Sequence, residues 1–324
     1  MTTGADGPVD EFDFIARLMR PLSGGAPEAL DLLDDAAVLP SRPGYDLIVT
    51  SDMIVEGVHF LPSDPLDLVA RKLLRVNLSD LAAKGAEPYG WFLSVSWPGR
   101  CGWAEREAFA HGLAQDQQAF GLRLFGGDTT STPGPLTASA TLMGWTPTGQ
   151  AKLRSTARDG DVILVSGVIG DGWLGLKAAL GEIEAPGALQ RYRLPEPRLG
   201  LRAALTAAHA CADVSDGLLA DAGRIAIASN LMAEIDLERL PFSEDGLRHV
   251  ATASEQGLID LATGGDDYEL VLTAAPERAE HVIAAAAVAG VRLTTIGRMT
   301  AGQGVRGLYQ GREAPLHRLG YRHA

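Results

Sequence analysis

Strand-like and helix-like patterns alternate along almost all of this 324-residue chain, and this alternation constrains the fold more than any other feature. We expect strands at Asp46–Thr50, Tyr89–Trp97, Leu122–Phe125, Pro135–Trp145, Asp161–Ser166, Ala212–Ser215, Ala233–Leu237, Tyr268–Thr273 and Arg292–Arg298. Helices are expected at Glu11–Met19, Leu66–Gly85, Trp103–Phe120, Trp173–Leu180, Leu199–Ala210, Leu218–Ser229 and Glu277–Ala289. Such an alternation is typical of α/β proteins.

The length is about twice that of a usual domain, so we expect two domains, each with its own core. Residues 1–10 show no apolar pattern and are predicted to be a flexible tail. The stretch Thr146–Gly160 is rich in turn-forming residues and lacks periodicity, which favours a domain boundary there. The predicted domains are an N-terminal domain over residues 11–147 and a C-terminal α/β domain over residues 148–324.

The charge balance excludes some classes of partner. With 28 Lys and Arg against 41 Asp and Glu, the net charge is −13, so bulk electrostatics attract neither nucleic acid nor an anionic membrane. Cys101 and Cys211 do not form a disulfide framework or a zinc motif. The acidic start does not have the pattern of a signal peptide, and the most apolar stretch, Val282–Val291, is about half of the roughly 20 residues that span a bilayer. We therefore expect a cytoplasmic protein.

Six short segments place one or two Asp beside small or hydroxylated residues, most of them after an apolar run. They are Leu33–Ala37, Thr50–Asp52, Asn77–Asp80, Gly126–Thr130, Asp213–Gly217 and Gly264–Tyr268. Any one of them is explained by a turn or a helix cap, where Asp and Gly are common. Together they indicate a binding site, because ligands of open α/β sheets bind where strands end.

Asp80 is the most informative of these residues. It continues the helical stripe of Leu66 and Leu73, so we expect it on a buried face. A carboxylate there needs a cation, a hydrogen-bond network or a metal. Asn77 and Lys84 share this face and are the alternative partners.

Many carboxylates without nearby Cys or clustered His are typical of Mg²⁺ sites. No segment fits a calcium loop, and the chain lacks the glycine-rich phosphate loops and the protein-kinase motifs. Mg²⁺ usually binds one or two carboxylates together with substrate phosphates. The dispersed Asp residues therefore predict a polyphosphate substrate that is held through several Mg²⁺ ions.

Five segments, in this order and spacing, resemble the thiamine-monophosphate kinase family. They are Thr50–Phe60, Asn77–Pro88, Phe125–Thr130, Asp213–Leu218 and Gly264–Leu270, and the resemblance extends from about Glu11 to Tyr321. This family shares a superfamily with aminoimidazole ribonucleotide synthetase, selenophosphate synthetase and a hydrogenase-maturation dehydratase subunit. The resemblance implies mixed sheets flanked by helices, ATP and Mg²⁺ in a cleft between two domains, and a homodimer that forms through the N-terminal domain.

The resemblance also assigns residues position by position. It implies Mg²⁺ ligands at Asp35, Thr50, Ser51, Asp52, Asp80, Asp128, Asp213 and Asp216. It implies ATP contacts at Gly127, Asp128, Arg154 and Ser215, and thiamine phosphate contacts at His59, Asp266 and Tyr321. Asp52, Asp80 and Asp128 are the expected catalytic residues. The family pattern has Glu in place of Asp266, and it often has G-x-G-D-D where this chain has Leu32-Leu33 before Asp34-Asp35.

The implied reaction is direct in-line transfer of the ATP γ-phosphoryl group to thiamine monophosphate, a step of thiamine diphosphate biosynthesis. Selenophosphate synthetase would need a Cys near the N-terminus, and the maturation protein would need a C-terminal Cys, whereas this chain ends Tyr321-Arg322-His323-Ala324. Aminoimidazole ribonucleotide synthetase is the enzymatic alternative. A non-catalytic regulator that binds nucleotide or metal, and a purely structural role for the Asp residues, are the other hypotheses.

Overall fold

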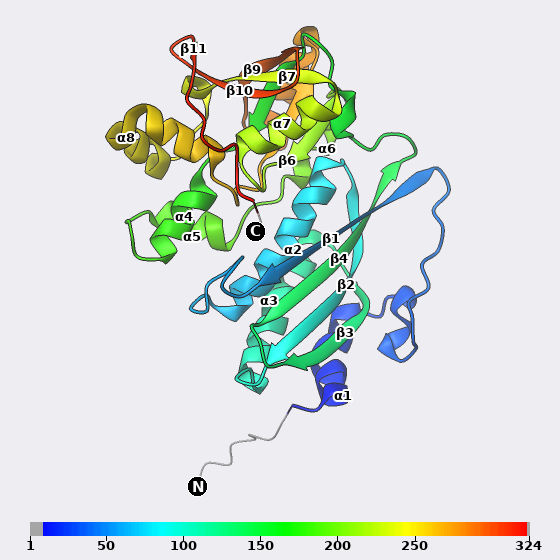
Figure 1. Ribbon diagram of the computed structural model, residues 1–324. Helices are drawn as coiled ribbons and strands as arrows, with labels where there is room; N and C mark the ends of the chain where they lie inside the picture. The colour runs from blue at the N-terminus through cyan, green and yellow to red at the C-terminus, as the bar shows by residue number, and fades with distance from the viewer. Residues whose placement is uncertain (1–8, 323–324) are drawn as a thin grey trace. The chain divides into compact units, whose positions relative to one another are not determined.

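A computed structural model describes residues 9–322, which form two compact units (Figure 1). The first unit contains the chain up to Leu81 together with Glu87–Trp145. The second contains Ala82–Ala86 and the chain from Thr146 onward. Of the predicted flexible tail, residues 1–8 lie outside the described residues.

The first unit is built on a four-stranded mixed sheet. Its strands are β1 (Tyr45–Val55), β2 (Glu87–Pro98), β3 (Leu124–Thr132) and β4 (Thr137–Pro147), in the order β1-β4-β2-β3. Strand β2 runs parallel to β3 and antiparallel to β4. Helices α2 (Leu66–Ala83) and α3 (Trp103–Phe120) lie against one face, where Trp97 and Phe109 meet edge to face with ring centroids 5.4 Å apart (Figure 1).

Short helical segments precede this sheet. They are α1 (Glu11–Phe14), a π-helical turn (Ile15–Met19) and two 3₁₀ segments, Arg20–Ser23 and Pro27–Leu32. The last segment contains three consecutive non-glycine residues in the left-handed region, with φ of +49° at Leu30, +57° at Asp31 and +54° at Leu32. The chain therefore makes a left-handed turn just before Asp34 without using glycine, a strained conformation that elsewhere clusters at functional sites.

The second unit has a seven-stranded mixed sheet. The strands are β5 (Val162–Ser166), β6 (Ala210–Asp213), β7 (Leu231–Asp236), β8 (Leu270–Ala274), β9 (Leu293–Ala301), β10 (Gly304–Tyr309) and β11 (Arg312–Glu313), in the order β11-β10-β7-β9-β5-β8-β6. Among the described strands of this sheet, β7 and β10 pair in parallel and the other neighbours pair antiparallel.

Helices cover both faces of this second sheet. They are α6 (Arg202–Leu205), α7 (Leu218–Ala228), α8 (Glu244–Thr263) and α9 (Ala279–Val288), whereas α4 (Asp171–Ala179) and α5 (Pro186–Arg193) pack against each other and against Leu261 of α8. Ile163 and Val165 pack into the cluster with α7 and α8, whereas the intervening Leu164 packs into the cluster with α6 and α9. This alternation is the strand period of two and explains why residues Val162–Val165 of β5 are all apolar. Within residues 9–322, the helices are too short or too polar to cross a membrane.

The expected α/β architecture of mixed sheets flanked by helices is confirmed, and several element boundaries were wrong. The predicted helix Leu199–Ala210 ends at Leu205, because Ala210 begins β6 and pairs with Thr273 of β8. Helices α5 and α8 and strands β10 and β11 were not predicted. Strand β1 continues through Asp52 and β3 through Thr132, so both extend beyond the strands expected at Asp46–Thr50 and Leu122–Phe125.

A cross-strand charge cluster contributes to the second sheet. Glu234 on β7 faces Arg298 of β9 and Arg306 of β10 in register, and Arg298 donates a hydrogen bond of 2.9 Å to its carboxylate. These two guanidinium groups hold the pKa of Glu234 below its ordinary value. A carboxyl with a lowered pKa stabilises the fold above its ordinary pKa, and this stability is lost as the pH falls.

We therefore expect Glu234→Gln to lower the melting temperature at pH 7, with a difference from wild type that shrinks as the pH falls below about 4.5. Thermal melts at pH 7 and pH 3.5 check this. Glu313→Gln, an exposed change on the edge strand β11, serves as the control and is expected to match wild type at both values. A pH-independent loss in the Glu234 variant would contradict the electrostatic explanation.

Candidate functional site

The clearest group of predicted site residues lies between β1 and α2. The Thr50 hydroxyl donates a hydrogen bond of 2.5 Å to Asp80 Oδ2. Asn77, one turn before Asp80, accepts the Asp52 backbone N–H at 2.9 Å and donates to the Leu73 carbonyl. Strand β1 therefore presents Thr50 and Asp52 to the polar positions at the end of α2.

Two carboxylates meet in this group. Burial and the neighbouring Asp80 carboxylate raise the pKa of Asp52 to about 6. Mutual repulsion of this kind is relieved by a shared proton or by a cation. The helix face that contains Leu73 and Asp80 was expected to be buried. Leu73 is fully buried, whereas Asp80 is half-buried. Thr50 and Asp52 are its partners, and Asn77, one of the expected alternatives, binds the backbone of Asp52 instead.

Ser51 points away from this group, because successive side chains of a strand face opposite sides. Its hydroxyl lies 2.9 Å from that of Thr141 on β4. His59 follows β1 in a turn, where its Nδ1 accepts the Val55 N–H at 3.1 Å and its carbonyl accepts Lys72 Nζ at 3.1 Å. In the neutral ring this arrangement places the proton on Nε2.

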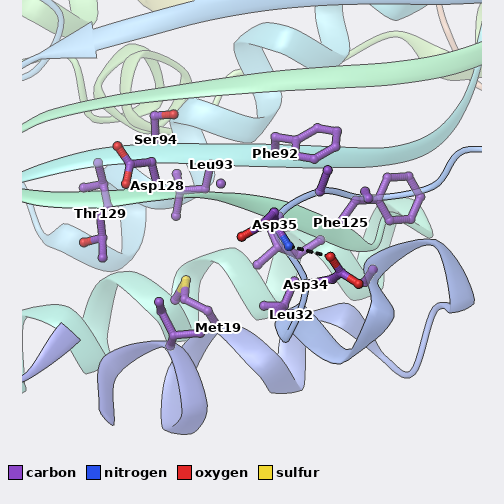
Figure 2. Close-up of a pocket in the computed structure, with 18 of the residues that line it drawn as sticks. Met19, Leu32, Asp34, Asp35, Phe92, Leu93, Ser94, Phe125, Asp128 and Thr129 are labelled. Atoms are coloured by element: carbon purple, nitrogen blue, oxygen red, sulfur yellow. Dashed lines mark hydrogen bonds between the residues drawn. The ribbon is translucent and has the colours of Figure 1, made fainter. Parts of the chain in front are cut away.

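A pocket of about 540 Å³ lies beside β3 in the same unit. Figure 2 shows Asp34, Asp35 and Asp128 among the residues that line it, with the Asp35 N–H bonded to Asp34 Oδ1 at 2.8 Å. Its other walls are largely apolar and include Met19, Leu32, Phe92 and Phe125 (Figure 2). The pocket thus combines carboxylates with apolar and aromatic walls, a composition typical of small-molecule sites.

The segment Gly126–Thr130 was interpreted as following a strand, and this is wrong, because it lies inside β3. Gly127 makes the continuation possible. Its φ is +152°, and a Cβ there would lie 1.8 Å from the Leu93 carbonyl oxygen of β2. Asp128 follows it on this edge strand with an exposed side chain, in register with Ser94.

Gly127→Ala is therefore expected to destabilise the protein by about 2 kcal/mol or more, because strained φ and a backbone clash are combined. Denaturant melts followed by circular dichroism measure this change. Gly99→Ala is the matched control, since a Cβ at Gly99 meets nothing within 4 Å. Equal stability of the two variants would show that β3 can shift away from β2 at little cost.

The second unit brings five predicted residues together. Asp213 ends β6, and the following Ser215 and Asp216 form the loop before α7. The Ser215 carbonyl accepts the Asp266 N–H at 2.8 Å, and the Asp216 carbonyl accepts the Tyr321 N–H at 2.8 Å. The loop that carries Ser215, a predicted ATP contact, and Asp216, a predicted metal ligand, therefore also binds the backbone of Asp266 and Tyr321. These two residues are the predicted substrate contacts of this unit.

Asp266 belongs to a tightly constrained loop. Its φ is +68° and that of Tyr268 is +51°, and the Tyr268 hydroxyl lies 3.2 Å from Asp266 Oδ1. A Cβ at Gly265 would lie 2.6 Å from the Ser215 carbonyl oxygen, so only glycine permits the close approach of the two loops. Gly265 is therefore required for the close contact between the two loops rather than for flexibility of the chain.

Arg154 lies apart from these loops. It is exposed, its carbonyl accepts a hydrogen bond of 2.9 Å from the Ser229 hydroxyl at the end of α7, and the adjacent Leu153 bridges to Ala210. Ala210 begins β6, whereas Asp213 ends it. Arg154 and Ser215 therefore lie near opposite ends of this strand.

Sequence reasoning missed Asp221 and Arg224 on α7. The Asp221 carboxylate is fully buried, and burial raises its pKa to about 6 although Arg224 opposes the shift. It accepts the backbone N–H groups of Ser215 and Asp216. The available signal was an acidic residue in the first turn of a helix that follows a glycine, a position that favours carboxylates.

Apart from Ser51, whose hydroxyl faces Thr141, the predicted metal ligands fall into three groups. The first is Thr50, Asp52 and Asp80, the second is Asp35 and Asp128, and the third is Asp213 and Asp216. In the part of the chain that the structure describes, no three His, Cys, Asp or Glu side chains gather closely enough to hold one metal ion. Strands β4 and β2 separate Asp52 from Asp128. Each group could supply one or two carboxylates, the number that Mg²⁺ takes when water and phosphate complete its shell.

Two protein-family models match the chain. The model of "AIR synthase related protein, N-terminal domain" matches residues 33–146, and that of "AIR synthase related protein, C-terminal domain" matches residues 158–310. Together they span most of both units.

Named relatives and solved structures are similar over nearly the full length. A thiamine-monophosphate kinase of Caulobacter vibrioides is 56% identical over 98% of this chain and 92% of that protein. The crystal structure of thiamine-monophosphate kinase from Stenotrophomonas maltophilia superposes with a TM-score of 0.83 at 38% identity, over 94% of this chain and 98% of that one. A structure described as AaThiL complexed with AMPPCP and TMP has a TM-score of 0.78 at 29% identity, over 97% of each chain.

Proposed function

We propose that this chain, which belongs to the thiamine-monophosphate kinase family, transfers the γ-phosphoryl group of ATP to thiamine monophosphate. The products are thiamine diphosphate and ADP. The observation that carries the proposal is the Ser215–Asp216 loop, whose carbonyl groups bind the N–H groups of Asp266 and Tyr321. Backbone hydrogen bonds therefore connect the loop of the proposed nucleotide contact Ser215 to the proposed acceptor contacts Asp266 and Tyr321. The complex of a relative with AMPPCP and TMP supports this pair of substrates.

A divalent cation fits the donor sets of the site. Burial, together with the neighbouring Asp80 carboxylate, raises the pKa of Asp52 to about 6, and a hard cation would stabilise the two charges. We propose that the residues holding several Mg²⁺ ions are Asp35, Thr50, Ser51, Asp52, Asp80, Asp128, Asp213 and Asp216, with Ser51 contributing only through its main chain. Bound Mg²⁺ would neutralise the phosphates and the charge that develops on the transferred phosphoryl group.

The remaining proposed contacts divide by ligand. Gly127, Asp128, Arg154 and Ser215 are proposed to contact ATP. His59, Asp266 and Tyr321 are proposed to contact thiamine monophosphate, where the Asp266 carboxylate carries the charge that complements the thiazolium cation. The pocket beside β3 offers apolar walls for the nucleobase next to Asp128. Of the proposed ATP contacts in the second unit, Arg154 lies near the start of β6 and Ser215 follows its end.

The proposed phosphoryl transfer mainly requires that the protein position the two substrates and stabilise their charge. The second pKa of a phosphate monoester is about 6, so the acceptor is mostly deprotonated at neutral pH and a general base is not required. Asp52, Asp80 and Asp128 are proposed to act by holding charge rather than by moving protons. We propose in-line transfer without a phosphoenzyme, which predicts inversion of configuration at a chiral γ-phosphorus. Retention, or trapping of phosphorylated protein, would overturn this step.

The test of the function compares three acceptors. ADP formation from ATP and Mg²⁺ is measured with thiamine monophosphate, with thiamine and with the aminoimidazole precursor that aminoimidazole ribonucleotide synthetase would use. We expect turnover with thiamine monophosphate alone. Turnover with the third compound would favour the enzymatic alternative. Thermal stabilisation by ATP and Mg²⁺ without ADP formation from any acceptor would favour a regulator.

We also propose a homodimer that forms through the first unit. One face of β1 exposes Leu47, Val49 and Met53, of which Val49 is 56% and Met53 54% accessible. An exposed run of apolar side chains on a strand is a common interaction surface. Light scattering is expected to give about twice the 34.1 kDa mass of the chain. Val49→Asp should reduce it to the single-chain mass, whereas a monomeric wild type would exclude the dimer.

A further inference from the structure

The carboxylate of Asp221 is a buried anchor for the loop that joins β6 to α7. It lies in the first turn of α7 and is fully buried. Its Oδ2 accepts hydrogen bonds from the backbone N–H groups of Ser215 at 3.1 Å and Asp216 at 3.0 Å. A buried carboxylate is costly without its donors, so these bonds fix the two peptide groups against α7.

The carbonyl groups of the same dipeptide are engaged on the other side. Ser215 accepts the N–H of Asp266 and Asp216 accepts that of Tyr321, each at 2.8 Å. All four main-chain polar groups of Ser215–Asp216 therefore have partners. A displacement of this dipeptide would therefore move its own proposed metal and nucleotide contacts. It would also shift the backbone of Asp266 and Tyr321, the two proposed contacts with the acceptor.

Arg224 adds a side-chain bond to this arrangement. Its guanidinium donates to Asp221 Oδ1 and to Asp216 Oδ2. One planar group thus joins the buried anchor to the carboxylate that we propose as a metal ligand. Lysine could not reproduce this contact, because its single ammonium lacks the planar fork that bridges two carboxylates. Arg224 is 42% exposed, so the fold does not depend on its burial.

We propose that Asp221 and Arg224 are positioning residues of the proposed kinase site. Asp221 holds the backbone of Ser215–Asp216, and Arg224 sets the direction of the Asp216 carboxylate. The inference rests on the proposed function, and both residues act through the Ser215–Asp216 dipeptide rather than on the substrates.

The chain offers a matched control pair for this proposal. Asp245 also lies in the first turn of a helix, α8, where its buried carboxylate accepts a backbone N–H, that of Ala188, at 2.9 Å. It also pairs with an arginine three residues later, Arg248. Asp245 therefore has the local chemistry of Asp221 but holds α5 rather than the Ser215–Asp216 loop.

The experiment compares Asp221→Asn, Arg224→Lys and Asp245→Asn in the full chain. Mn²⁺ binding in the presence of a non-hydrolysable ATP analogue is followed by electron paramagnetic resonance, and kcat, KM and melting temperature are measured beside it. We expect Asp221→Asn to weaken Mn²⁺ binding and lower kcat by about 10- to 100-fold per folded molecule, the usual cost of losing a partner that orients a metal ligand. Arg224→Lys should reduce both by a smaller factor without a large change in melting temperature.

Asp245→Asn is expected to lower the melting temperature while binding and turnover per folded molecule remain at wild-type values. Wild-type binding and turnover in folded Asp221→Asn, or equal losses in Asp245→Asn, would overturn the proposal. If Asp221→Asn does not fold, Arg224→Lys decides, and wild-type behaviour of that variant overturns the proposal. Should wild type bind the Mn²⁺ and nucleotide but form no thiamine diphosphate, the proposed kinase function fails while the binding comparison still tests the positioning role.

Discussion

Asp128→Asn is expected to lower turnover by more than about 100-fold, since even partners that only orient a metal ligand are worth about 10- to 100-fold. The substitution keeps the volume of the side chain and removes its charge from the edge strand β3. Because the Asp128 side chain is exposed, its loss should change the free energy of unfolding by no more than about 0.5 kcal/mol. A large kinetic effect on an unchanged fold would identify the carboxylate as part of the site.

The measurement is kcat at saturating ATP, Mg²⁺ and thiamine monophosphate, with a denaturant melt of the same preparation. Asp159→Asn removes an equally exposed carboxylate from a turn of the second unit and is expected to behave as wild type in both measurements. If Asp128→Asn kept wild-type turnover at ordinary Mg²⁺ concentration, the assignment of Asp128 to a metal site would be wrong.

Asp80→Asn is expected to abolish turnover in a different way, because it should also stabilise the metal-free protein. Burial, together with repulsion from Asp80, raises the pKa of Asp52 to about 6. A carboxyl with a raised pKa costs stability once the pH is high enough to ionise it. Removing the charge of Asp80 relieves part of this cost, by up to about 1 kcal/mol at pH 8, and the gain should vanish near pH 5. The amide oxygen introduced by the substitution can still accept the Thr50 hydroxyl.

Thermal melts with a chelator at pH 5 and pH 8, then with Mg²⁺ and ATP, test this expectation. Wild type should gain more stability from Mg²⁺ and ATP than the variant does, so the order of the two melting temperatures should reverse on adding ligand. Lower stability of Asp80→Asn in the chelator at pH 8 would mean that Asp80 serves the fold, as the structural hypothesis for these Asp residues requires.

The fold class could be predicted because apolar periodicity is strong in the buried strands and in α2 and α7. Helix α8 was missed because Gly246, Gly257 and the non-helical Ser254, with φ of +53°, interrupt its pattern. The alanine-rich stretch after Leu205 has high helix propensity, but the pairing of Ala210–Asp213 with β8 outweighs it. Tertiary contacts of this kind are absent from a local pattern.

The sequence predicted which segments carry site residues, but it did not predict which of these segments lie next to each other in the fold. The Asp-containing motifs predicted site roles for Asp52, Asp80, Asp216 and Asp266 because the order and spacing of these motifs resemble a family. The contacts that connect them span long stretches of sequence, such as Thr50 with Asp80, and local patterns do not encode which strand lies beside which helix. Asp221 was missed because a single acidic residue in a helical first turn is equally explained as a favourable charge at the helix N-terminus.

The most direct test of the account is a ³¹P NMR time course of the purified chain with ATP, Mg²⁺ and thiamine monophosphate. We expect the monophosphate resonance of thiamine to disappear as the resonances of thiamine diphosphate and of ADP appear in equal molar amounts, and we expect a chelator to stop the reaction. ADP and inorganic phosphate without thiamine diphosphate, or no change in the spectrum, would contradict it.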